Sequence, residues 1–266
     1  MVSHHKLSGV AGRVAIIASL VVGVGLLESR NIAEATIVSP TRTTNIEGNG
    51  NNNIPFNNFL VSPLGVRYQQ VFAAPDFLSI EPGLITKIAF RPDAGRAGNA
   101  FSSTIPNIQI NLSTTSLLPD VLSTTFAENV GDDETIVYNG ELLLSSANIS
   151  TPKQPKDFDI VIDLENPFFY DPNQGNLLLD VRTFSFTRTT AFDSENTFGD
   201  SISRVFSFDS RASTGTADTT GLVTKFTIAT RNNTALIPES SSTVALLAFG
   251  ALTAISQVKR SLATPK

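Results

Sequence analysis

Apolar residues alternate with polar ones through much of the middle of the chain, and this period of two constrains the fold more than any other feature. It is clearest in segments 108–112 and 158–164, where every second residue is apolar. Successive side chains of a β-strand point to opposite faces of a sheet, so the pattern predicts strands with one buried face. Segments of the same type are 66–72, 84–91, 177–182 and 222–228.

Turn residues separate these segments. Asn139 and Gly140 lie between two apolar runs, and this pair predicts a type I′ hairpin turn. Residues 171–175 predict a second turn. The best helical candidate is short, with Asp120 as the N-cap of 121–129 and Gly131 after its end. We therefore expect an antiparallel β-sandwich of jelly-roll type over residues 55–231.

Two polar stretches predict loops. Residues 43–53 are rich in Asn and Gly, and residues 187–221 are dominated by Ser, Thr, Asp and Gly. Such compositions bury little apolar area. We expect residues 36–54 to form an Asn/Gly-rich linker.

The N-terminal residues predict a secretory signal peptide at 1–35. Lys6 and Arg13 precede an uncharged apolar run at 14–27, which is too short to span a membrane but typical of a signal sequence. Ala33 and Ala35 form the small-residue pattern that signal peptidase accommodates, so we expect cleavage before Thr36.

The C-terminal residues predict a short membrane helix. After a linker at 232–242, an apolar run at 243–258 is followed by Lys259 and Arg260, which places the helix at 243–260 with a basic tail to residue 266. Cations after an apolar run favour a cytoplasmic end. The run is shorter than the roughly 20 residues of a typical span, so spanning requires bilayer thinning or snorkelling.

Ile237-Pro238-Glu239-Ser240, followed by the apolar run and the basic pair, resembles the PEP-CTERM sorting signal of exported bacterial proteins. The resemblance implies recognition by exosortase, a membrane transpeptidase thought to cut near this motif. Pro238 and Glu239 then serve a processing enzyme and are not catalytic groups. Ser240 replaces the second proline and six residues follow Arg260, so the alternative is an anchor that stays uncleaved.

Three internal segments carry a second resemblance. Residues 67–76, 110–115 and 176–182 look like segments that recur in one group of PEP-CTERM ectodomains. The resemblance covers roughly residues 55–230. It implies a fold and no chemistry.

Composition restricts the chemistry of residues 36–239, the body of the protein between the two expected terminal signals. The chain has no Cys and no Trp, and both histidines, His4 and His5, lie in the expected signal peptide. Disulfide scaffolds, zinc ribbons, thiol enzymes and Ser-His-Asp catalysis are thereby excluded. Removing both ends takes six of 19 basic and two of 24 acidic residues, so the net charge falls from −5 to −9. This acidic body argues against nucleic-acid binding.

Acidic residues supply the candidates for metal binding or hydrolysis. Asp132, Asp133 and Glu134 form the densest cluster, which predicts either a calcium site or a charged turn. Asp157, Asp159 and Asp163 share one face of a predicted strand, with neighbours ~7 Å apart. That spacing suits an inverting glycosidase or calcium, and a solvated outer face is the alternative.

Aromatic residues supply the candidates for sugar stacking. Tyr68, Tyr138, Tyr170 and 18 Phe could form platforms or belong to the core. Sequons begin at Asn111, Asn148 and Asn232, but the bacterial sorting signal argues against glycosylation.

The sequence thus favours a non-enzymatic exported protein of the cell surface or extracellular matrix, without a cofactor other than calcium. Signal peptidase and exosortase would process it, and extracellular polysaccharide is a candidate partner. The alternative is a carbohydrate-binding module that depends on calcium, or a two-carboxylate glycoside hydrolase.

Overall fold

The computed structural model describes residues 32–59, 63–96, 98–148 and 155–231, and this part of the chain is all-β. Three short 3₁₀ helices, η1 (Thr41–Thr43), η2 (Ala74–Phe77) and η3 (Phe126–Asn129), interrupt the strands. The strands are β1 (Ile32–Ser39), β2 (Gly50–Asn52), β3 (Val66–Phe72), β4 (Gly83–Phe90), β5 (Phe101–Thr115), β6 (Thr135–Ser146), β7 (Ile160–Tyr170), β8 (Asn176–Thr183), β9 (Phe192–Asn196), β10 (Ile202–Ser207), β11 (Thr216–Asp218), β12 (Thr220–Leu222) and β13 (Thr224–Arg231).

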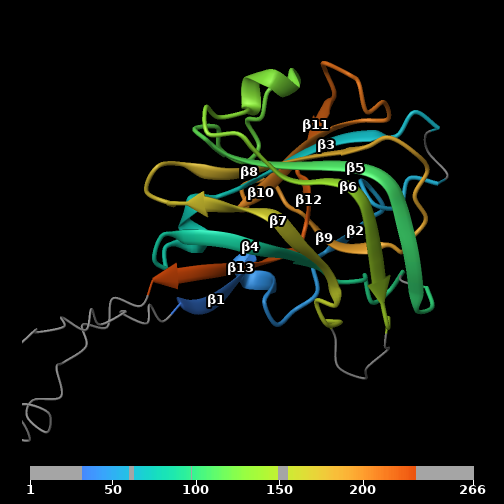
Figure 1. Cartoon of the computed structure of the whole chain (residues 1–266), viewed down its shortest axis with the longest axis horizontal. Coiled ribbons are helices and arrows are strands. Elements are labelled where there is room, and N and C mark those ends of the chain that lie inside the picture. Colours follow the sequence, from blue (N-terminus) through green and yellow to red (C-terminus); the bar gives the residue numbers. More distant parts are fainter. Residues whose placement is uncertain (1–31, 60–62, 97, 149–154, 232–266) are drawn as a thin grey trace, which may run out of the picture. The chain divides into compact units, whose positions relative to one another are not determined.

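The strands form three sheets in which neighbouring strands are antiparallel (Figure 1). A four-stranded sheet has the order β1-β13-β4-β7, and a six-stranded sheet has the order β11-β10-β3-β8-β5-β6. A small third sheet has the order β12-β9-β2. The all-β prediction is confirmed, and the arrangement is sandwich-like.

One apolar core lies between the four-stranded and the six-stranded sheets. The predicted alternation is visible in β7, where Ile160 and Ile162 are buried while Val161 and Asp163 are exposed. Side chains of the two sheets meet directly, as in the edge-on pair of Phe72 and Phe226, whose ring centroids are 4.9 Å apart. Burial of these apolar faces holds the two sheets together.

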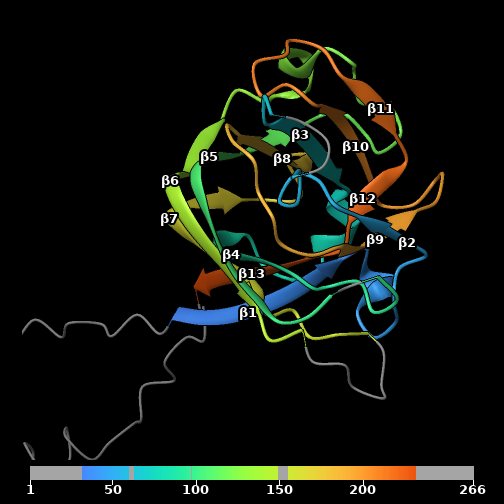
Figure 2. The same cartoon turned by 90° about the vertical axis from the view of Figure 1, so that its right-hand side faces the viewer.

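The central strands of the six-stranded sheet are buried on both faces, which corrects the prediction of one buried face for β3 and β8. Val71, Leu178 and Val205 point outward from this sheet and pack with Leu122 and Phe126. The covering residues belong to the β5–β6 connection, which carries η3, and they lie near β11 (Figures 1 and 2). A second, smaller core is the result.

Both stretches predicted as loops contain strands, and the predicted linker at 36–54 contains the second half of β1 together with η1 and β2. The prediction failed because it equated polar composition with solvent exposure. In β9, Asp193, Ser194 and Glu195 are all buried. Asp193 pairs with Arg91 and Glu195 pairs with Arg42, and such pairing permits burial of charge.

Two local predictions were wrong and one is confirmed. Asn139 and Gly140 lie inside the continuous strand β6, opposite β5, so they form no hairpin. Residues 121–125 are not helical, because only η3 forms and Asp120 adopts the left-handed conformation with φ 64°. The turn at 171–175 does join β7 to β8, and Asp171 Oδ1 accepts a hydrogen bond from the Asn173 amide at 3.0 Å.

The first and last described residues are neighbours. In the β1–β13 ladder Ile32 lies opposite Arg231, at the edge of the four-stranded sheet. Ala33 and Ala35, of the predicted signal-peptidase site, are part of β1 and pair with Thr230 and Ile228.

The sorting motif Pro238–Glu239, the basic pair Lys259–Arg260 and both predicted terminal helices lie outside the described residues. Among the residues that are described, no helix has the length and apolarity needed to cross a membrane.

Candidate functional site

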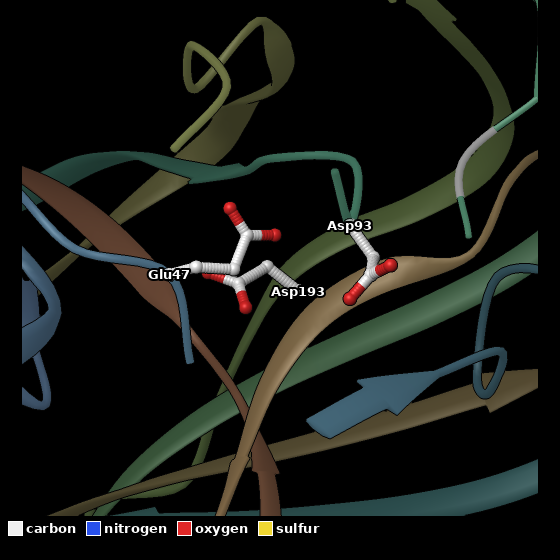
Figure 3. Close-up of side chains that lie close together, drawn as sticks. All are labelled: Glu47, Asp93 and Asp193. Carbon is white, nitrogen blue, oxygen red and sulfur yellow. The ribbon is translucent and has the colours of Figure 1, made fainter. Parts of the chain in front are cut away.

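Three carboxylates from distant parts of the sequence lie close together (Figure 3). Glu47 precedes β2, Asp93 follows β4, and Asp193 lies in β9. One oxygen from each carboxylate lies within 4.8 Å of the others. Among the described residues this is the group of acidic side chains that is compact enough to share one ion.

Backbone hydrogen bonds bring these three segments together. The Asp93 amide donates to Ala191 O, and the Asp193 amide donates to Arg91 O, each at 3.0 Å. The Gly48 amide donates to Asp193 Oδ1 at 2.9 Å. A Cβ on Gly48 would lie 2.2 Å from the backbone oxygen of Ser194, so glycine alone permits this close approach.

A buried arginine neutralises part of the cluster. Arg91 is 1% exposed, and its Nε donates to Asp193 Oδ2 at 2.7 Å. Its Nη2 donates to the carbonyl oxygens of Thr43 and Ile46, at 2.9 and 2.7 Å. The guanidinium also lies over the Phe158 ring, 4.7 Å from its centroid. Arg91 therefore fixes both the carboxylate in β9 and the backbone that leads to Glu47.

Burial changes the protonation of this cluster. Desolvation raises the pKa of the Asp193 carboxyl to about 7, against the lowering effect of Arg91 and with a further increase from the Glu47 charge. Burial also raises the pKa of Asp93, while the amides of Arg96 and Gly95 oppose that shift. Asp193 thus titrates near neutral pH.

The Glu47 charge repels Asp193, although Arg91 pairs with Asp193 and the charges of Arg96 and Lys156 act on Asp93. Glu47 Oε1 accepts from the Ala94 amide at 2.7 Å, whereas the buried Oε2 has no hydrogen-bond partner among the described residues. A bound proton or a divalent cation would each relieve this repulsion. Calcium prefers such hard oxygen ligands but takes 6–8 of them, so three carboxylates would supply part of its shell.

The acidic residues singled out in the sequence do not converge. Asp132, Asp133 and Glu134 are exposed. Asp133 Oδ1 accepts from the Thr114 amide at 2.7 Å, and Glu134 Oε1 accepts from the Asn111 amide group at 2.5 Å. These two side chains therefore fix a turn against β5.

The carboxylates around β7 are also separately engaged. Asp159 Oδ2 accepts from Ser146 Oγ and from the Ala147 amide, each at 2.9 Å. Asp163 is solvent-exposed and pairs with Lys87. Neither arrangement brings the two carboxylates together as a catalytic pair.

Two of the three tyrosines belong to the core, which is one of the two roles considered for the aromatic residues. Tyr68 and Tyr170 are buried in the core, where their hydroxyls donate to Gln70 Oε1 at 2.5 Å and to Gly175 O at 2.9 Å. Burial raises the pKa of both phenols far above its usual range. Tyr138 is half-buried.

Sequence reasoning missed the cluster of Glu47, Asp93 and Asp193, because Glu47 and Asp193 lie in predicted loops. One signal was present, since Asp193 and Glu195 follow the apolar Phe192 at alternating positions typical of a strand. Comparisons with known proteins give no further guide, because no family model, curated protein or solved structure matches this chain.

Proposed function

We propose that this chain is an exported, non-enzymatic protein of the cell surface or extracellular matrix. In this proposal signal peptidase removes the N-terminal segment, and exosortase recognises Pro238 and Glu239 in the PEP-CTERM-like signal. The acidic body, with its net charge of −9 after both ends are removed, suits an exported protein and disfavours nucleic acid as a partner.

The position of the two ends carries the proposal. Because β1 and β13 are antiparallel and Ile32 lies opposite Arg231, the described chain enters and leaves the body at the same end of one sheet. During export the N-terminal signal and the C-terminal segment would occupy the same membrane. A body whose two attachment points are neighbours can fold fully on the far side of that membrane while both segments are still held.

The strand order supports the jelly-roll type that we propose for the sandwich. The eight longest strands lie in two sheets, in the order β1-β13-β4-β7 in one sheet and β3-β8-β5-β6 in the other. Each connection from one of these eight strands to the next along the chain leads to the opposite sheet, except the connection from β5 to β6. This is the connectivity of two Greek keys wrapped into a double sheet.

Mass spectrometry of the exported protein tests the sorting proposal. The full chain is expressed in a bacterium that contains exosortase and in a derivative that lacks it. We expect loss of the segment after about Glu239 in the first strain alone. An exported chain that still ends at Lys266 in both strains would refute processing by exosortase.

A matched pair of variants sharpens the test. Glu239→Gln alters the motif, whereas Glu81→Gln changes an exposed glutamate of the body by the same atoms. We expect the E239Q chain to keep its C-terminal segment and the E81Q chain to lose it. Equal processing of both would remove Glu239 from the recognition signal.

A further inference from the structure

The first half of β1 consists of residues that the sequence assigns to the signal peptide. Ile32–Ala35 pair with Ile228–Arg231 of β13, whereas the expected cleavage before Thr36 removes them from the mature chain (Figures 1 and 2). β13 has β4 on its other side. Loss of Ile32–Ala35 therefore turns the end of β13 into an open edge of the sheet, where backbone amides and carbonyls lose their partners.

The segment that directly follows β13 fits this edge. Asn232 and Asn233 come first, and asparagine tolerates the left-handed backbone that both central positions of a type I′ hairpin turn require. Residues 234–237, Thr-Ala-Leu-Ile, come next and lie outside the described residues. We propose that, once the signal peptide is removed, residues 234–237 turn back along β13 and replace Ile32–Ala35 as its partner.

The register of this hairpin directs an apolar side chain into the core. A two-residue turn puts Thr234 opposite Arg231 and Ile237 opposite Ile228. Ile228 is 3% exposed and belongs to the core between the sheets. Opposite residues of an antiparallel pair share a face, so Ile237 takes the inward position that the smaller Ala35 has in β1. The exchange therefore buries more apolar area.

The outer face of the edge also suits the segment. Leu236 lies opposite Ala229 after the exchange, in the position that Glu34 has in β1. Ala229 pairs on its other side with Leu84, which in turn pairs with Phe169. Leu84 and Phe169 are 42% and 60% exposed. Leu236 therefore extends a row of apolar side chains, to which Glu34 contributes a charge instead.

Strand propensity and length favour the same exchange. Residues 234–237 include Thr and Ile, which are enriched in strands, whereas residues 32–35 include two Ala and a Glu, which are depleted. Pro238 has no amide hydrogen and ends the new strand. The retained part of β1 begins at that point, since Thr36 pairs with Thr227, the residue before Ile228. The replacement thus has the length of the part that is lost.

The exchange shortens the chain between the body and the expected membrane helix. This connection consists of residues 232–242 before the exchange and of residues 238–242 after it. At ~3.3–3.6 Å per residue, its greatest length falls from about 36–40 Å to about 17–18 Å. The body is drawn towards the membrane, and Pro238 and Glu239 come directly after the edge of the sheet. The inference deepens the proposed function and rests on it for the cleavage before Thr36.

Engineered cysteines report the exchange, because the chain has no cysteine of its own. Ala229→Cys and Leu236→Cys are combined in a chain that begins at Thr36 and in one that begins at Ile32, which contains every described residue. Both chains end at Lys266 and are purified in the same detergent. We expect severalfold more disulfide in the Thr36 chain after mild oxidation, measured by mass spectrometry. Equal disulfide formation in the two chains would overturn the proposal.

Leu84→Cys combined with Leu236→Cys is the matched control. Leu84 is exposed and neighbours Ala229, so a freely moving segment would reach both positions. Adjacent strands lie about 4.7–4.9 Å apart, which puts Leu84, two strands from the new one, beyond disulfide reach in the hairpin. We expect little disulfide in the L84C/L236C chain. As much disulfide there as in the A229C/L236C chain would also overturn the proposal.

The N-terminus of the exported protein separates this inference from the proposed processing. The two cysteine chains are made without signal peptidase, so their result does not depend on the cleavage site. An exported protein that begins at Thr36, together with no excess of disulfide in the Thr36 chain, overturns the exchange and leaves the processing intact. An excess of disulfide, together with an exported protein that keeps residues 32–35, supports the fit of the segment and overturns the expected cleavage site.

Discussion

Arg91 shows how single residues hold the candidate site together. Its guanidinium is always charged, and it is buried with a carboxylate and two backbone carbonyls as partners. Removing one member of a buried pair leaves the other charge without compensation, which costs far more than the loss of an exposed pair. The exposed pair of Lys87 with Asp163 offers the comparison.

We expect Arg91→Met to lower the free energy of unfolding by about 3–5 kcal/mol, because Asp193 and the carbonyls of Thr43 and Ile46 lose their donor. Lys87→Met should cost about 1 kcal/mol or less, since the side chains of Lys87 and its partner Asp163 are 40% and 73% exposed. Urea unfolding followed by circular dichroism measures both. Similar losses for the two variants would contradict the central role of Arg91.

The raised pKa of Asp193 predicts a pH-dependent stability. Its folded value of about 7 exceeds the unfolded value near 3.9, so the folded chain binds the extra proton between these pH values. This contribution is present at acidic pH and is lost as the pH rises through 7. Melting temperatures measured from pH 5 to 8 should therefore fall less steeply in Glu47→Gln, which lacks the charge that raises this pKa, than in the wild type.

The Glu47→Gln variant also tests whether the three carboxylates bind a divalent cation. Glu81→Gln, at an exposed position, is the control for the loss of one negative charge. If a divalent cation binds Glu47, Asp93 and Asp193, millimolar calcium at pH 8 raises the melting temperature of the wild type and of E81Q but not of E47Q. If calcium leaves all three unchanged, the cluster binds no calcium under these conditions.

Substitution of two glycines, Gly65 and Gly199, measures the cost of backbone strain separately from the cost of steric overlap. Both have positive φ, +75° at Gly65 and +81° at Gly199, but a Cβ on Gly65 would lie 1.8 Å from the Thr183 backbone oxygen. A Cβ on Gly199 meets nothing within 4 Å. We expect Gly199→Ala to cost about 1 kcal/mol and Gly65→Ala several times more, measured by thermal unfolding. Equal costs would mean that the backbone at Gly65 relaxes freely.

At the scale of elements, apolar alternation predicted strands well where one face meets solvent. It placed β7 and its buried face, because Val161 and Asp163 alternate with Ile160 and Ile162. It failed for β9, where Asp193 and Glu195 are buried with arginine partners that are remote in sequence. A strand of this kind cannot be predicted from its own residues, because the arginines that permit its burial lie elsewhere in the sequence.

Strand β1 gives a prediction at the same scale. The expected cleavage before Thr36 would keep the pairs from Thr36 to Ser39 with β13 and remove Ile32–Ala35 from the edge of the sheet. When both chains end at Arg231, one that begins at Thr36 should therefore melt several degrees below one that begins at Ile32, at ~2–4 °C per kcal/mol lost for a body of this size. Identical melting would show that the first half of β1 adds no stability.

At the scale of the molecule, the sandwich class could be predicted from the sequence but the acidic site could not. Glu47, Asp93 and Asp193 meet through the third sheet, which was not predicted. The fold topology brings such distant residues together, whereas the pattern of a single sequence predicts only local structure.

The pairing of β1 with β13 also determines how the body would respond to mechanical force. Pulling Ile32 and Arg231 apart opens their ladder one pair at a time, so little force is needed. Pulling on Arg231 along the axis of β13 instead loads this strand between β1 and β4, where many hydrogen bonds resist together. A body attached by its C-terminal end alone would therefore withstand drag that the same body, held by both ends, would not.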